Sequence, residues 1–336
     1  MTATGAPHQR TSEPFEPDVY RPVSTSSDEL GFTRRPPVHW LSPSMLASTA
    51  GQVVISSVFG EFLDKRELQG SFPARVHDER PHAADDTDVW FDYVADVGDG
   101  FNPTYTVAYL LGQDHLEVAG ERLPRGRFLV MGGDEIYPTP STSLYADKMK
   151  GPYKAAMPQP PPEGSPRMYA LPGNHDWYDG LSSFMRLFAK GGRDNIGGWT
   201  NEQDRSYFAI RLPHRWWLLA IDTQFGAYID DPQLAYFREV VTHIEKGDRV
   251  IVCPPNPSWV EATEDPDAYN AMDYFVRTVL KPTGATIKVM LSGDLHHYAR
   301  YENPKRQLIH CGGGGAYLYP THRMPEHITV PPPSDN

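Results

Sequence analysis

The chain has 336 residues, 39% of them hydrophobic and 12% aromatic, which is enough to bury the core of one large domain or two small ones. Its 31 basic and 43 acidic residues give a formal net charge of -12, which argues against a broad nucleic-acid-binding surface. The two cysteines offer no disulfide framework. The sequence contains no run of about 20 apolar residues that would predict a membrane span, and it does not begin with a signal-peptide pattern. These features together predict a soluble, cytoplasmic protein.

The first part of the chain separates into two predicted segments. Residues 1–37 are rich in Pro, Ser, Thr and charge, which predicts a disordered tail. Residues 38–85 follow as an N-terminal helical extension, in which Ser42 is a plausible cap and Pro43 the first helical residue. The apolar residues that continue to residue 67 predict an amphipathic helix packed on the domain. Interfacial membrane docking by this helix is the rival interpretation, and the few nearby basic residues do not favour it.

Four apolar runs then end in glycine and in side chains that can hold a metal ion. The runs and the residues that follow them are Val89–Ala95 with Asp96 and Gly98, Arg127–Met131 with Gly133, Asp134 and Tyr137, Met168–Leu171 with Gly173, Asn174 and His175, and Thr286–Leu291 with Gly293, Asp294 and His296. Each run is typical of a strand, and α/β proteins build their sites at the carboxyl ends of strands. The sequence therefore predicts one site formed by four separate loops.

The ordered blocks resemble the calcineurin-like metallophosphoesterase superfamily and, within it, the purple acid phosphatase pattern. The subgroup pattern reads DxG, GDxxY, GNH[DE], a lone His and GHxH. The chain has Asp96-Val97-Gly98, Gly133-Asp134-Glu135-Ile136-Tyr137 and a complete Gly173-Asn174-His175-Asp176. The resemblance covers about residues 86–320. It implies an α/β fold, a four-layer α/β/β/α sandwich of two mixed sheets flanked by helices, which we expect over residues 86–325, with a C-terminal tail over 326–336.

The resemblance also implies two metal ions bridged by one carboxylate. Asp134 is the implied bridge, and its position after a strand and a glycine pair agrees with that role. The first ion would be held by Asp96, Asp134, Tyr137 and His296, and the phenolate oxygen of Tyr137 suits ferric iron.

The second ion would be held by Asp134, the amide oxygen of Asn174 and groups in which this chain departs from the family. Asp294 stands where GHxH has its first His, and no His follows the strand-like run 249–252, where Cys253 or Asn256 is the candidate. This set favours Mn²⁺, Mg²⁺ or Ca²⁺ unless Cys253 binds as a thiolate. The expected cofactors are thus two ions of Fe, Mn or Zn type.

His175 is the implied general acid, or at least the hydrogen-bond donor to the leaving oxygen, and nearby carboxylates are expected to hold it charged. Several other side chains have weaker claims, each weighed against an ordinary structural role. They are Asp99, Asp176, Asp222 and His297 as groups that orient ligands, His310 and His322 as substrate contacts, Arg193, Arg205, Arg300 and Arg323 as phosphate clamps, and Trp177, Tyr178, Trp216, Trp217 and Tyr298 as cleft walls.

The sequence therefore predicts a metal-dependent phosphoesterase that hydrolyses a phosphomonoester or phosphodiester by means of a dinuclear metal centre and metal-bound hydroxide. Two alternatives stay open: a catalytically degenerate relative that binds a ligand or partner, and a membrane-surface enzyme that acts on lipid phosphate. The expected partner is a phosphate-ester substrate, and the oligomeric state is left open.

Overall fold

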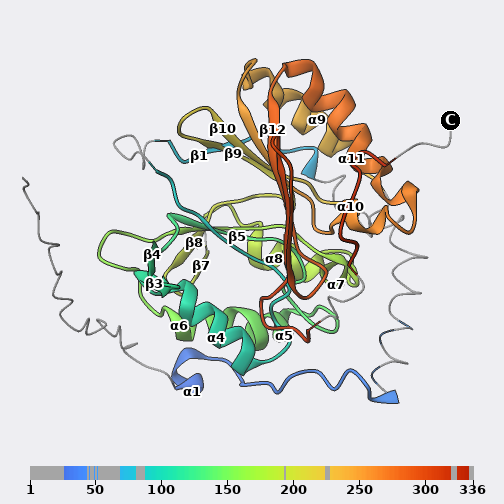
Figure 1. The fold of residues 1–336 in the computed structure, drawn as a ribbon. Helices are drawn as coiled ribbons and strands as arrows, with labels where there is room; N and C mark the ends of the chain where they lie inside the picture. The colour runs from blue at the N-terminus through green and yellow to red at the C-terminus, as the bar shows by residue number, and fades with distance from the viewer. Residues whose placement is uncertain are drawn as a thin grey trace, which may run out of the picture.

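Two β-sheets pack face to face, with helices on the outer side of each (Figure 1). The computed structural model describes residues 26–43, 45, 49, 51, 69–80, 88–192, 194–223, 228–318 and 324–332. Most of the amphipathic helix predicted over residues 38–67, including its possible membrane-docking face, lies outside these residues. Within them, no helix is both long enough and apolar enough to cross a membrane.

The larger sheet has seven strands in the order β1-β9-β10-β11-β12-β14-β13. Their bounds are β1 (Val76–Asp78), β9 (Phe208–Leu212), β10 (Trp216–Ala220), β11 (Arg249–Cys253), β12 (Thr286–Ser292), β13 (Tyr298–Glu302) and β14 (Gln307–Cys311). Strands β10, β11, β12 and β14 run parallel, while β9 and β13 are antiparallel to their neighbours β10 and β14. The sheet is therefore mixed, as the resemblance implies.

The smaller sheet has five strands in the order β2-β5-β6-β8-β7. Their bounds are β2 (Asp92–Val94), β5 (Phe128–Met131), β6 (Arg167–Ala170), β7 (Asp194–Ile196) and β8 (Trp199–Asn201); a separate hairpin joins β3 (His115–Val118) to β4 (Glu121–Pro124). Strands β2, β5, β6 and β8 are parallel and β7 is antiparallel. Because the inner strands of both sheets are parallel, the loops at their carboxyl ends gather at one edge of each sheet.

Helices cover the outer face of each sheet. Beside the five-stranded sheet lie α4 (Phe101–Leu111), α5 (Thr142–Tyr145), the π-helix η2 (Ala146–Lys150), α6 (Gly151–Ala156), α7 (Asn174–Trp177) and α8 (Ser182–Phe188). Beside the seven-stranded sheet lie α9 (Asp231–Val240) with η4 (Val241–His243), α10 (Ser258–Glu261), η5 (Pro266–Tyr269), α11 (Asn270–Phe275), η6 (Val276–Leu280) and η7 (Lys281–Thr283). A short α1 (Ser27–Leu30) precedes them all.

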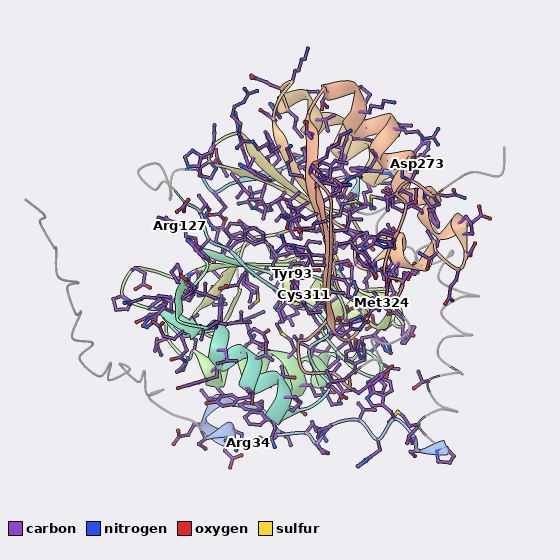
Figure 2. The ribbon with its side chains drawn as sticks, viewed as in Figure 1. Arg34, Tyr93, Arg127, Asp273, Cys311 and Met324 are labelled. Carbon is purple, nitrogen blue, oxygen red and sulfur yellow. The ribbon has the colours of Figure 1, made fainter. Side chains whose placement is uncertain are left out.

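Three apolar layers hold the four structural layers together. In β5, Phe128 and Val130 pack between the sheets, whereas Leu129 and Met131 pack against the helices of their own side. This alternation is the period-two pattern of a strand whose two faces are both buried. Tyr93 and Cys311 mark the middle of the molecule, between the two halves (Figure 2). The predicted four-layer α/β/β/α sandwich is confirmed.

Contacts with the domain reach into the predicted segments at both ends of the chain. Residues 26–37 are not free of the domain, because Phe32 is buried and stacks on Phe101 with ring centroids 5.6 Å apart. The predicted helical extension contributes β1 to the edge of the larger sheet, parallel to β9. At the other end, Ile328 and Val330 pack against the outer core of that sheet, so residues 326–332 are part of the domain. Composition missed these contacts because a few apolar anchors suffice to dock a polar segment.

Candidate metal and catalytic site

The predicted ligands come from loops at the carboxyl ends of strands in both sheets. Asp96 follows β2, Asp134 follows β5, and Asn174 begins α7 after β6, all in the five-stranded half. Asp294 and His296 follow β12 in the seven-stranded half. Backbone hydrogen bonds join the loops of the two halves here. The site therefore lies at the boundary between the two sheets.

The hydroxyl of Tyr137 stands at the centre of the first set of predicted ligands. It lies 2.8 Å from Asp96 Oδ1, 3.0 Å from Asp134 Oδ2 and 2.9 Å from His296 Nε2, and His296 Nε2 is itself 3.4 Å from Asp96 Oδ1. Two ligand atoms that each lie about 2.1 Å from one metal ion, with an angle of about 90° at the ion, are about 3 Å apart. The spacing of these four atoms fits that requirement.

The imidazole of His296 is oriented for such a role. Its Nδ1 lies 2.7 Å from the carbonyl oxygen of Tyr317, which can only accept, so Nδ1 carries the proton. Nε2 then keeps its lone pair and faces Asp96 and Tyr137. Burial lowers the pKa of His296 to about 4, which keeps the ring neutral at pH 7.

Backbone conformation aims the three carboxylates at one another. Asp96, Asp134 and Asp294 have φ values of 63°, 57° and 72°, in the left-handed region that non-glycine residues adopt rarely. Backbone N–H groups fix two of them: Asp294 N donates to Asp96 Oδ2 at 3.0 Å, and His175 N donates to Asp134 Oδ1 at 2.9 Å. Strained residues of this kind cluster at functional sites.

A cavity of about 490 Å³ opens beside this cluster. The described residues that line it are Gly133, Asp134, Gly173, Asn174, Thr223, Pro255, Asn256, Glu261, Asp265, Asp267, Ala268 and Asp294. None of these residues is basic. Asn174 Oδ1 is buried and has no hydrogen-bond partner among the described residues. A buried acceptor without a donor is costly, and a cation beside it would remove that cost.

The structure separates the two candidates for the missing His. Cys253 is fully buried in the apolar layer between the sheets, where burial raises the pKa of its thiol. Asn256 lines the cavity instead, with its Nδ2 donating to Glu261 Oε2 at 2.7 Å. The sequence analysis did not single out Glu261. The one feature that could have pointed to it is its position in the chain, shortly after the loop that follows β11. The predicted second set, with Asn256 in place of Cys253, then has only oxygen ligands.

The carboxylates of the site repel one another in a buried setting. Burial, and then the charge of Asp176, raise the pKa of Asp134 to about 8, while burial and Asp134 raise the pKa of Asp294 to about 7. Burial, with Asp134 next, also holds the pKa of Asp96 well above its usual range. A bound cation would reverse these effects by favouring the charged forms.

No three of the described His, Cys, Asp and Glu side chains by themselves form a group ready to enclose an ion. The phenol of Tyr137 joins the carboxylates to the imidazole in the first set, and Asn174 and Asn256 line the cavity together with Asp134 and Asp294 in the second.

His175 lies beside the cluster in a box of aromatic rings. Its ring centroid is 4.5 Å from that of Tyr137, 5.0 Å from Tyr178 and 6.0 Å from Trp40. Nδ1 donates to the carbonyl oxygen of Pro138 at 2.7 Å. Burial lowers the pKa of His175, and this outweighs the opposing effects of the Pro138 hydrogen bond and the nearby carboxylates. The prediction that carboxylates hold the ring charged is thus corrected, because burial is the larger effect.

The weaker candidates that orient loops divide into several groups. Asp176 accepts from the backbone N–H groups of Gly173 and Glu135, and Asp222 accepts from Trp177 Nε1 at 3.0 Å. His297 and His310 face each other with Nε2 atoms 2.8 Å apart. Asp99 binds the N-terminal segment, Arg205 contacts Asp204 and the carbonyl oxygen of Pro73, and Arg300 pairs with Glu302 on the surface. Of the aromatic residues, Trp177, Trp216 and Trp217 pack in the cores, Tyr178 flanks His175 and Tyr298 is exposed. The other three candidates, Arg193, His322 and Arg323, lie outside the described residues.

Known proteins were compared with this chain by sequence and by structure. No family model and no curated protein sequence matches it. Among solved structures, GAP50, the anchor in the inner membrane complex of Plasmodium, is similar at 14% identity and a TM-score of 0.45 over 69% of this chain and 75% of that one. Phosphopantetheinyl hydrolase from Mycobacterium tuberculosis is similar at 12% and 0.34 over 72% and 96%, and a putative 5'-nucleotidase from Staphylococcus aureus at 15% and 0.33 over 67% and 48%.

Proposed function

We propose that this chain is a metal-dependent phosphoesterase. The observation that carries the proposal is the position of the Tyr137 hydroxyl, 2.8 to 3.0 Å from Asp96, Asp134 and His296. An assembly of two carboxylates, a phenol and a neutral imidazole at such spacing is typical of a site for a transition-metal ion.

The residues fit two neighbouring cations. Asp96, Asp134, Tyr137 and His296 would hold one. Asp134, Asn174, Asn256 and Asp294 would hold another at the edge of the cavity. When bound, such ions neutralise phosphate oxygens and activate water for attack on phosphorus. Since none of the described cavity residues is basic, the charge of the substrate has no other counterpart there.

The chain's own residues provide position and a proton. His175 Nδ1 donates to Pro138 O, so Nε2 is the nitrogen that can give a proton to the leaving oxygen once the neutral ring favoured by burial has taken up a proton there. The tilted ring of Tyr137 supports one face of this imidazole. Asp134 connects His175 with the ligand cluster, because its Oδ1 accepts from His175 N while its Oδ2 contacts Tyr137.

The test begins with elemental analysis of protein purified without added metal. The protein is then loaded with Mn²⁺, Fe or Zn²⁺ and assayed with p-nitrophenyl phosphate and bis(p-nitrophenyl) phosphate. We expect turnover with at least one ion, and a loss of at least about 100-fold in Asp134→Asn, because a neutral amide would hold a cation less well than a carboxylate. Asp273→Asn is the matched control, because Asp273 pairs with Arg277 on the surface.

A binding protein without catalysis is the second candidate. The lack of an imidazole in the oxygen-only set around the cavity favours it, because this set departs from the family pattern. Folded protein that binds about one ion, and turns over neither ester with any of the three metals, would support this candidate over the phosphoesterase. The cytoplasmic location stays a prediction.

A further inference from the structure

The N-terminal strap, residues 32–42, is docked on the domain beside the candidate site. Thr33 N donates to Asp147 Oδ1 and Arg35 Nε donates to Asp147 Oδ2, each at 2.8 Å. Arg35 O accepts from Phe101 N at 2.8 Å. Arg34 marks the strap at the edge of the molecule near α4 (Figure 2). These bonds hold a segment that composition alone predicts to be a tail.

Farther along the strap, Asp99 anchors Trp40 against the loop that also carries Asp96. Asp99 Oδ1 accepts from Val38 N at 3.0 Å, and Oδ2 accepts from the indole Nε1 of Trp40 at 3.4 Å. Lys148 reinforces the anchor, because its Nζ donates to the carbonyl oxygens of Asp99 and of Tyr137 at 3.1 and 2.9 Å. The position of Trp40 is therefore coupled to the first ligand set.

The indole of Trp40 forms part of the aromatic surround of His175. Its ring centroid lies 6.0 Å from His175 at an interplanar angle of 85°, 5.5 Å from Tyr137 at 75° and 5.1 Å from Tyr317 at 59°. Tyr317 is 46% exposed, and Trp40 and Tyr178 are part-exposed. An aromatic surface thus surrounds the imidazole and reaches solvent.

We propose that Trp40 determines the specificity of the site for phosphate esters whose leaving group is a flat aromatic ring. The inference rests on the proposed phosphoesterase activity. The imidazole of His175 adjoins the ligand cluster, because His175 N donates to Asp134 Oδ1. The group attached to the leaving oxygen of a phosphate held by that cluster would therefore occupy the space bordered by Trp40, Tyr178 and Tyr317. Ring-to-ring contact there favours an aromatic leaving group over a saturated one of equal size by about 3- to 10-fold.

The experiment compares phenyl phosphate with cyclohexyl phosphate, which differ in flatness far more than in size. The ratio of their kcat/KM values is measured for the wild type and for Trp40→Ala, Trp40→Leu, Trp40→Phe and Leu41→Ala. Comparing this ratio between proteins cancels the intrinsic reactivity of each ester. Leu41 is the matched control because it adjoins Trp40 and is 93% exposed.

We expect the phenyl-to-cyclohexyl ratio to fall about 3- to 10-fold in Trp40→Ala and Trp40→Leu, to be largely retained in Trp40→Phe, and to be unchanged in Leu41→Ala. Thermal unfolding identifies any variant that does not fold; Trp40→Leu, which keeps much of the volume, then decides in place of Trp40→Ala. A ratio that does not change overturns the proposal. If both esters lose activity equally in that case, Trp40 has a purely structural role.

A binding measurement separates this inference from the proposed activity. Calorimetry with the Mn²⁺-loaded protein compares phenylphosphonate with cyclohexylphosphonate, whose carbon–phosphorus bonds are not hydrolysed. Selective binding of phenylphosphonate that disappears in Trp40→Ala or Trp40→Leu supports the aromatic subsite even if neither ester is turned over, in which case only the hydrolase proposal fails. Equal affinity for the two phosphonates overturns the subsite even in an active enzyme.

Discussion

Tyr137 shows how much one hydroxyl can organise in this site. It contacts two carboxylates and an imidazole from three different loops. We expect Tyr137→Phe to weaken metal binding by at least about 10-fold, because a ligand and its hydrogen bonds are lost together. Metal titration followed by calorimetry checks this. If iron is the native ion, the phenolate charge-transfer band should also disappear.

Tyr153→Phe provides the matched control. Tyr153 is as deeply buried as Tyr137, and its hydroxyl has no hydrogen-bond partner among the described residues. Removing that oxygen should leave metal affinity unchanged and the free energy of unfolding equal or slightly higher. Equal effects of the two substitutions on metal binding would contradict the role assigned to Tyr137.

His77, on β1, makes stability depend on pH. Burial, with Arg75 next, lowers its pKa from 6.5 to about 3, so the ring stays neutral in the folded protein while the unfolded chain takes up a proton below about pH 6.5. Stability contributed by the neutral ring is therefore lost as pH falls. Between pH 7 and pH 5 the loss is about 2 kcal/mol.

His77→Phe keeps a ring against Tyr169, whose centroid is 4.9 Å away, and cannot titrate. Urea unfolding at pH 7 and pH 5 should show a drop in the free energy of unfolding that is smaller by about 2 kcal/mol than in the wild type. An identical drop in both proteins would show that this imidazole does not carry the effect.

At the scale of elements, the loop after β2 depends on Gly98. A Cβ at this position would lie 2.2 Å from the carbonyl oxygen of Glu135, and the φ of +75° already disfavours other residues. We expect Gly98→Ala to lower the free energy of unfolding by roughly 3 kcal/mol or more. Gly120 has a similar φ of +83° with nothing within 4 Å of such a Cβ, so Gly120→Ala should cost only about 1 kcal/mol. Chemical denaturation compares the two.

Asp147 holds the part of the N-terminal strap around Thr33 and Arg35. Asp147→Ala removes the acceptor for Thr33 N and Arg35 Nε and should loosen this part of the strap with little change in Tm. Tryptic cleavage after Arg34 is then expected to accelerate several-fold. Asp273→Ala, which breaks only the surface pair with Arg277, should leave the cleavage rate as it is. Unchanged cleavage in Asp147→Ala would contradict the role of Asp147.

The sequence was sufficient for the two sheets and for the loops that bear the candidate site. Strand-like runs ending in glycine and acidic residues predict the loops, since hydrophobic pattern and turn chemistry are local properties. The two mixed sheets are implied by the resemblance to a known family. The strap, Trp40 and Glu261 escaped prediction for a different reason. Their roles come from contacts such as Val38 with Asp99, which join residues far apart in the chain and leave no periodic pattern.

Cys253 illustrates the same limit within a single motif. The sequence places it nearest the register of the missing His, but register along a strand does not by itself say which face a side chain takes. Successive strand residues point to opposite sides, and Cys253 falls on the side that faces the other sheet. Asn256, three residues later in the loop, lies at the cavity.

For the molecule as a whole, the site takes its candidate ligands from both halves. Asp134 and Asn174 belong to the half with five strands, and Asn256 and Asp294 to the other. An ion shared between them should stabilise the entire fold: at 100 times its Kd it adds about 2.7 kcal/mol, or a Tm rise of about 5 °C or more. Calorimetric scans with and without Mn²⁺ check this, and Asp134→Asn should show no rise.

The left-handed backbone at Asp96, Asp134 and Asp294 implies a trade-off. Glycine would relieve about 1 kcal/mol of strain at each position and would also remove a crowded negative charge. Selection for folding stability alone would therefore replace these three aspartates. Their presence together is what one expects of a chain selected for a functional site at the expense of stability.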